Sequence, residues 1–244
     1  MLTSLYKYQT LSAYSLASLV NNTVWLAHPS SFNDPFDCAV TLDRKKFMES
    51  LEHAIARFGQ QARPEDIAGK DLTGVRPGDA EAYDEYRNGV KALLQEMGVL
   101  CLSEVPDNML MWSHYANHHR GFCVEYDFGE GTELKKIAHA VRYSGSITSL
   151  SAADMVGPNR SESFEALWLT KAECWAYEKE WRAIMPKGGK SYQAPSATRA
   201  VIFGARMPEP DRIMVARALR HEQDLQFKEA VIEEDKFSVA IIGA

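Results

Sequence analysis

The segment WAYEKEWR brings together two carboxylates and a guanidinium, at Glu178, Glu180 and Arg182. Because side chains alternate between the two faces of a strand, a strand over 177–185 would place these three charges on one face. A carboxylate in such a row can hold a ribose hydroxyl and stabilise an oxocarbenium-like transition state, as carboxylates do in glycosyl transfer. The alternative is a solvated strand face with a surface ion pair worth about 0–1 kcal/mol, and the residue types alone favour it.

A second candidate is the turn segment PSSFNDPFD, which carries Asn33 and Asp34. Asparagine and aspartate close turns through their own side chains, and proline fixes the backbone geometry, so local structure explains this composition. A rigid turn at the end of a strand can also present both side chains to a ligand, because loops on rigid scaffolds often carry binding sites.

The third candidate is MWSHYANHHRG, in which His114 and His118 would share one face of a helix. Two such histidines can hold zinc when a third ligand converges on them. The sequence has no H-E-x-x-H motif and no obvious third ligand, so we expect no metal. The aromatic side chains of this segment, Trp112 and Tyr115, are of the kind more often found in a core than against a cofactor.

Three further residues match the ligand types of some magnesium nucleases. Asp127 is followed by Glu133 and Lys135, an acid and then E-x-K, although this pattern is common by chance. There is no Walker loop, no G-x-G-x-x-G and no nucleophile elbow. A metal-dependent nuclease therefore stays as a further alternative.

The elements that must position these residues alternate irregularly along the chain. Apolar spacing predicts strands at 5–8, 24–27, 99–103, 121–127, 137–143, 177–185, 199–203, 227–232 and 237–242, and helices after Ser12, over 43–58, 83–97, 109–118 and 161–175, and from Pro210. Without regular βαβ alternation, this pattern predicts an α+β fold: one mixed, largely antiparallel β-sheet core with helices packed on it. We expect a single domain over 1–244, in which the polar segment 59–80 forms a mobile loop or insertion that proteases cleave first.

Composition places the chain among ordinary globular proteins, with 45% hydrophobic and 25% charged residues. The net charge is −6 and basic residues are mixed with acidic ones, which disfavours general electrostatic binding to nucleic acid. No apolar run approaches the ~18–20 residues of a membrane span. The amino terminus lacks a secretory pattern and the four cysteines form no C-x-x-C pair. We therefore expect a cytoplasmic protein with reduced thiols and no membrane partner.

Several short motifs follow one another in an order that is specific in combination. They are LYKY at 5–8, PSSFNDPFD at 29–37, LS at 102–103, MWSHYA at 111–116, GFCVE at 121–125 and YEKEWR at 177–182. Together they closely resemble a large bacterial family, domain of unknown function 2971, over most of the chain from about Leu5 to the strand at Val201. The resemblance implies a bacterial protein, and homologues of such families often sit among phage-defence or toxin genes.

A weaker likeness is to the ADP-ribosyltransferase fold, whose members use NAD. Those enzymes carry a first-strand His or Arg, a middle Tyr or Ser, and a late strand glutamate that is often part of E-x-E. Here Glu178-Lys179-Glu180 is similar to the last element, and His114 and Tyr115 supply the middle one. Tyr6-Lys7-Tyr8 stands where the first element would be, with lysine and tyrosines in place of His or Arg.

This likeness implies roles for the candidate residues. The catalytic set would be Glu180, Glu178, Tyr115 and His114, and the set binding NAD would be Tyr6, Lys7, Tyr8, Asn33, Asp34 and Arg182. Glu180 would stabilise the ribose, Glu178 would position the acceptor, and Tyr115 or Tyr8 would stack on nicotinamide. If these motifs form one site, Lys7, Asn33, His114 and Glu180 should line a common cleft.

Two classes of function therefore remain beside the nuclease. One is an NAD-using transferase of ADP-ribosyl type, whose acceptor, protein or nucleic acid, the sequence leaves open. The other is a noncatalytic module that uses the same aromatic and charged row to bind a small ligand or a partner.

Overall fold

The computed structural model describes residues 2–42, 44–45, 47–49, 80–150 and 160–243. These residues fall into two units. The first unit comprises Met1–Ala27, Gly98–Val141 and Cys174–Ala244, and the second comprises His28–Met97 and Arg142–Glu173. The segment 59–79, which belongs to the expected mobile insertion, lies outside the described residues.

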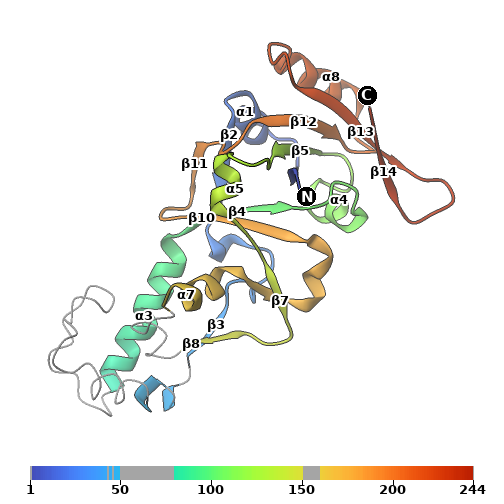
Figure 1. Cartoon of the computed structure of the whole chain (residues 1–244). Helices are drawn as coiled ribbons and strands as arrows, with labels where there is room; N and C mark the ends of the chain where they lie inside the picture. The colour runs from blue at the N-terminus through green and yellow to red at the C-terminus, as the bar shows by residue number, and fades with distance from the viewer. Residues whose placement is uncertain (1, 43, 46, 50–79, 151–159, 244) are drawn as a thin grey trace. The chain divides into compact units, whose positions relative to one another are not determined.

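The first unit is built on an eight-stranded sheet with the order β14-β13-β12-β5-β1-β4-β10-β6 (Figure 1). The strands are β1 (Ser4–Gln9), β4 (Gly98–Ser103), β5 (Phe122–Asp127), β6 (Ala138–Ala140), β10 (Glu180–Met185), β12 (Thr198–Phe203), β13 (Gln226–Ile232) and β14 (Val239–Gly243). Neighbouring strands are antiparallel except β12 and β13, which are parallel. The predicted mixed, largely antiparallel α+β fold is confirmed.

Helices cover both faces of this sheet. The helices are α1 (Ala13–Val20), α4 (Met109–Tyr115), α5 (Glu133–Ile137) and α8 (Glu209–Ala218). Apolar residues of α1, α5 and α8 pack with Leu5, Leu102 and Val124 on one face. On the opposite face, α4 packs with Tyr8 and Cys123. Alternation along each strand therefore separates the larger core from the face that carries α4.

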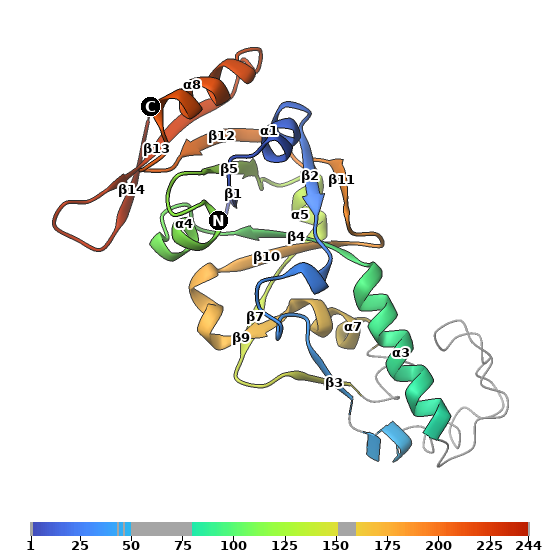
Figure 2. The same cartoon turned by 180° about the vertical axis from the view of Figure 1, so that it is seen from behind.

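A small sheet completes the first unit. It pairs β2 (Thr23–Leu26) with β11 (Lys190–Gln193), and a single bridge joins Ala27 to Val99. Figure 2 shows β2 and β11 beside each other, with α1 next to β2.

Among the residues that the structure describes, the second unit contains helices and short strands. They include the 3-10 turn η1 (Pro29–Ser31), α3 (Ala80–Glu96), α7 (Arg160–Leu169), the parallel pair β3 (Val40–Leu42) and β8 (Thr148–Leu150), and the parallel pair β7 (Arg142–Ser144) and β9 (Thr170–Ala172). Inside it, the Lys171 ammonium pairs with the Asp37 carboxylate at 3.4 Å, and both side chains are buried.

Several predicted boundaries were wrong, mostly at short elements. The predicted helix over 161–175 ends at Leu169, and the helix over 109–118 ends at Tyr115. The predicted strand over 137–143 is divided between α5, β6 and β7. Strands of three residues are too short to display a period of two, so apolar spacing cannot separate them from their neighbours.

Candidate ligand-binding site

Asn108 fixes the start of α4. Its Oδ1 accepts hydrogen bonds from the backbone N–H groups of Leu110 and Met111, at 2.9 and 3.2 Å. Its Nδ2 donates to the carbonyl of Tyr177 at 3.0 Å. One side chain thus caps the helix and ties it to the turn before β10, because its three hydrogen bonds satisfy backbone groups that helix and turn leave unpaired.

Replacing Asn108 by Ala should lower the free energy of unfolding by about 1–2 kcal/mol, the usual cost of losing a helix cap. Asn108→Asp is the matched variant, since it keeps the cap acceptor and replaces the amide donor to Tyr177 by a charged carboxylate oxygen. We expect Asn108→Asp to cost less than Asn108→Ala when both are measured by urea unfolding. Equal losses for the two variants would show that the cap itself contributes nothing.

The turn before β10 separates the two candidate glutamates. Glu178 ends the 3-10 turn η3 (Glu173–Glu178), whereas Glu180 begins β10. Between them, Lys179 has a φ of 44°, in the left-handed region. The prediction that one strand face carries Glu178, Glu180 and Arg182 was therefore wrong for Glu178, because a left-handed residue interrupts the alternation.

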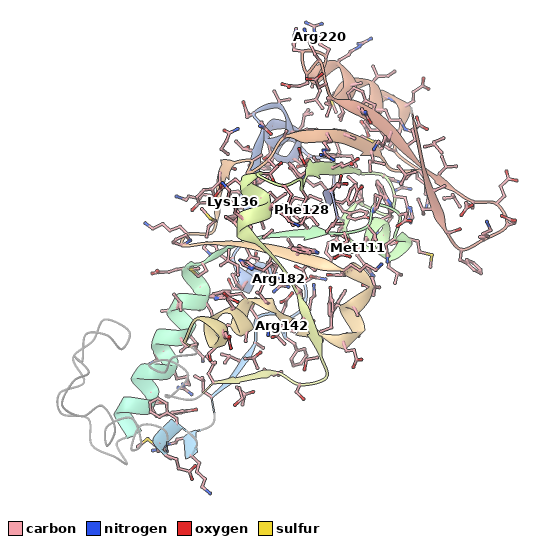
Figure 3. All side chains as sticks on the ribbon, viewed as in Figure 1. Met111, Phe128, Lys136, Arg142, Arg182 and Arg220 are labelled. Carbon is pink, nitrogen blue, oxygen red and sulfur yellow. The ribbon has the colours of Figure 1, made fainter. Side chains whose placement is uncertain are left out.

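Glu180 and Arg182 do share one face of β10, and they form a forked ion pair. The guanidinium Nε donates to Glu180 Oε1 at 2.8 Å, and Nη2 donates to Oε2 at 3.0 Å. The two residues are 4% and 0% exposed. The solvated-face alternative was therefore wrong, since this face of β10 (Arg182 is labelled in Figure 3) is buried.

Four rings lie next to one another in a group that we call the aromatic cluster: His114, Tyr115, Trp175 and Tyr177. The ring of His114 lies 6.2 Å from that of Tyr115 and 6.3 Å from that of Trp175, which in turn lies 6.0 Å from Tyr177. The Tyr115 hydroxyl donates to Glu178 Oε1 at 2.7 Å. Glu178 is 2% exposed, while His114 is exposed and the other rings are half-buried. A carboxylate and aromatic faces thus lie together within the first unit.

The comparisons with known proteins bear on this region. Residues 111–183 match the family model DUF2971, described as a protein of unknown function. The family resemblance is confirmed over residues 111–183, which we call the DUF2971 segment, and its extension from Leu5 to Val201 stays a prediction. The DUF2971 segment runs from α4 to β10, so it contains the whole aromatic cluster and the Glu180–Arg182 pair. No curated protein and no solved structure matches the chain significantly, so the likeness to ADP-ribosyltransferases gains no support.

Tyr6, Lys7 and Tyr8, the predicted NAD-binding residues of β1, lie next to β5 of the DUF2971 segment. Their side chains lie in different surroundings. Tyr8 is buried against Trp112, with ring centroids 5.1 Å apart, and its hydroxyl donates to the Val105 carbonyl at 2.7 Å. Burial raises the pKa of Tyr8. Tyr6 is half-buried and opposite Ser103. Of the two tyrosines expected to stack on nicotinamide, Tyr115 belongs to the aromatic cluster and Tyr8 to the core.

Lys7 is half-buried, and its Nζ donates to the carbonyl of Cys101 at 3.2 Å. Desolvation lowers the pKa of Lys7. Desolvation also raises the pKa of the Cys101 thiol, and the Glu180 carboxylate raises it further. Cys101 is opposite Arg182 on β4, so the thiol lies in the same buried polar row as the ion pair and stays protonated at neutral pH.

Asn33 and Asp34 belong to the second unit, before β3. The Asp34 Oδ1 accepts from the backbone N–H of Phe36 at 2.9 Å, and the Asp34 carbonyl accepts from the N–H of Asp37 at 3.1 Å. This is the local turn chemistry expected from the residue types. Lys7, His114 and Glu180 are in the first unit, so the cleft shared with Asn33 stays a prediction.

Local contacts account for the residues of the nuclease pattern. The Asp127 Oδ1 accepts from Arg199 Nη2 and from the backbone N–H of Gly129, both at 2.7 Å. Glu133 pairs with Lys136 on the exposed surface of α5, at 3.1 Å (Lys136 is labelled in Figure 3). Within the described ranges, no three His, Cys, Asp or Glu side chains are grouped as metal ligands would be.

The expected histidine pair was also wrong. The helix ends at Tyr115, and Asn117, His118 and His119 all have positive φ, from 47° to 67°. His118 therefore does not follow His114 on a helical face. His119 Nε2 instead lies 3.2 Å from the Ser113 hydroxyl, and burial lowers the pKa of His119.

Two residues that position the site were not among the predicted site residues. Trp175 is the first residue of the WAYEKEWR segment. The close succession of Trp175, Tyr177 and Glu178 could have indicated that it belongs to the site. Asn108 stands directly before the helix predicted over 109–118, a position at which asparagine is a common cap. Among the residues that the structure describes, no helix is long and apolar enough to cross a membrane.

Proposed function

We propose that the first unit binds a small molecule with a positively charged aromatic ring at the aromatic cluster. The observation that carries this proposal is the hydrogen bond from the Tyr115 hydroxyl to the buried Glu178 carboxylate, at a group of rings in which His114 lies next to both Tyr115 and Trp175. The face of an aromatic ring attracts a cation by about 0.5–2 kcal/mol, and more when water is excluded. A nearby carboxylate adds attraction of the same sign.

NAD is the ligand to test first, because its nicotinamide ring is a cationic aromatic group. In the transferase form of the proposal, the bond between nicotinamide and ribose breaks and ADP-ribose passes to an acceptor. Glu178 is then the better candidate for stabilising the oxocarbenium-like ribose, since it lies at the cluster. Glu180, held by Arg182, is better suited to positioning the start of β10.

Trp175→Ala should weaken NAD binding by about tenfold or more, the loss expected when one aromatic stacking partner is removed. Phe237→Ala is the matched control, because Phe237 is exposed and lies outside the cluster. Calorimetric titration of the three proteins with NAD makes the comparison. Equal affinities for wild type and Trp175→Ala would reject the cluster as the binding site.

Turnover decides between a transferase and a noncatalytic module. Nicotinamide release and ADP-ribose products can be followed by mass spectrometry with lysate-derived acceptors. In a transferase, Glu178→Gln should reduce turnover by about 10²-fold or more while the protein stays folded, because a charge acting in the transition state is lost. NAD binding without any nicotinamide release would instead assign the site to a binding module.

A further inference from the structure

A hollow of the first unit shares no lining residue with the aromatic cluster. It has a volume of about 890 Å³ and is formed by the end of β1, by α1 and its flanks, by β2 and by one residue of β11. The residues that matter here are Lys7, Gln9, Tyr14, Ser18, Trp25 and Ser191. We call this hollow the α1–β2 groove. Its volume is within the range of small-molecule sites, about 300–1,000 Å³.

The charge of the residues that line the α1–β2 groove is positive. No lining residue is acidic, and Lys7 is the charged one among them. Its ammonium has three donors, yet the described residues offer it one hydrogen bond, to the Cys101 carbonyl, and no carboxylate within 4.0 Å. An ammonium that is desolvated and has donors to spare favours an anionic ligand, because its interaction with water is already weakened.

The walls of the groove add aromatic surface and polar groups. Trp25 is 52% exposed and Tyr14 is 88% exposed. The side chains of Gln9, Ser18 and Ser191 form no hydrogen bond with any part of the chain that the structure describes. Such a surface can stack on a planar ring and also bond to its polar edge.

We propose that the α1–β2 groove binds a small aromatic anion, with its ring on Trp25 and its phosphate or carboxylate on the Lys7 ammonium. This site is distinct from the aromatic cluster and takes a ligand of opposite charge. It is therefore independent of the proposed function.

Matched pairs of probes test the charge requirement. Adenosine monophosphate is compared with adenosine, and indole-3-acetate with indole-3-acetamide, by calorimetric titration of the whole protein. At least one anion should bind about tenfold or more tightly than its neutral counterpart, the effect of a charge-assisted hydrogen bond. The two pairs distinguish a phosphate ligand from a carboxylate ligand.

Variants locate the binding. Lys7→Met keeps the apolar stem and should abolish the preference for the anion, while Trp25→Ala should weaken both members of the pair by about tenfold. Trp175→Ala should change neither. Trp25 is a surface residue, so this variant decides the question even if Lys7→Met does not fold. Failure of both anions to bind at millimolar concentration, or binding that Trp175→Ala removes and Trp25→Ala does not, would overturn the proposal.

Discussion

Replacing Arg182 by Met should lower the free energy of unfolding by about 3–5 kcal/mol, because breaking a buried ion pair leaves the other charge buried without its counter-charge. Arg182 is 0% exposed, and it neutralises the Glu180 carboxylate through two hydrogen bonds of 2.8 and 3.0 Å. Methionine keeps the straight stem but has no donor for that carboxylate. Urea unfolding of wild type and Arg182→Met measures the difference.

A double variant separates the cost of leaving one buried charge unpaired from the net contribution of the ion pair to the free energy of unfolding. Glu180→Leu combined with Arg182→Met should recover much of the lost stability, since apolar residues often replace a buried pair at little net cost. Glu133→Gln, which breaks the exposed pair with Lys136, should cost no more than about 1 kcal/mol. A loss for Arg182→Met as small as that of Glu133→Gln would contradict the buried pair.

The second large effect is expected at Trp112, a buried residue of α4. Trp112→Ala should cost about 3–5 kcal/mol, the range for truncating a large buried aromatic side chain. Trp112 is 0% exposed, packs edge-on against Tyr8, and its indole N–H donates to the Pro106 carbonyl at 2.8 Å. The variant therefore loses apolar contacts and leaves a backbone acceptor unpaired.

Met109→Ala is the control on the same helix, because Met109 is 41% exposed. It should change the free energy of unfolding by no more than about 0.5 kcal/mol. Both variants are measured by urea unfolding, with near-ultraviolet circular dichroism of the folded state. Similar losses for Trp112→Ala and Met109→Ala would mean that α4 is not anchored through Trp112.

The sheet was largely predictable because its strands are long enough to display their periodicity. The alternation of Phe122, Val124 and Tyr126 predicts one buried face, and all three residues are buried there. The order of strands was not predictable, since β1 pairs with β4 and β5, which follow it by many residues. Apolar spacing reports which side of a strand is buried, but it does not report which strand lies next to it.

The candidate site was predicted in part for the same reason. Alternation correctly placed Glu180 and Arg182 on one face, but it could not reveal that this face is covered. Glu178 was wrongly predicted to share the strand face of Glu180, because Lys179 between them has a left-handed φ. Glycine in a sequence indicates that such a φ is possible, whereas lysine gives no such signal. The turn at Asp34 was predictable, because its chemistry involves only neighbouring residues.

Titration of the wild-type protein with 1-methylnicotinamide and with nicotinamide tests the central claim most directly. The two molecules share the ring and the amide, and only the first carries a fixed positive charge. Binding at the aromatic cluster beside Glu178 predicts that 1-methylnicotinamide binds at least about tenfold more tightly, from cation–π attraction of roughly 1–2 kcal/mol. Equal affinities, or no binding of the cation at millimolar concentration, would contradict the account.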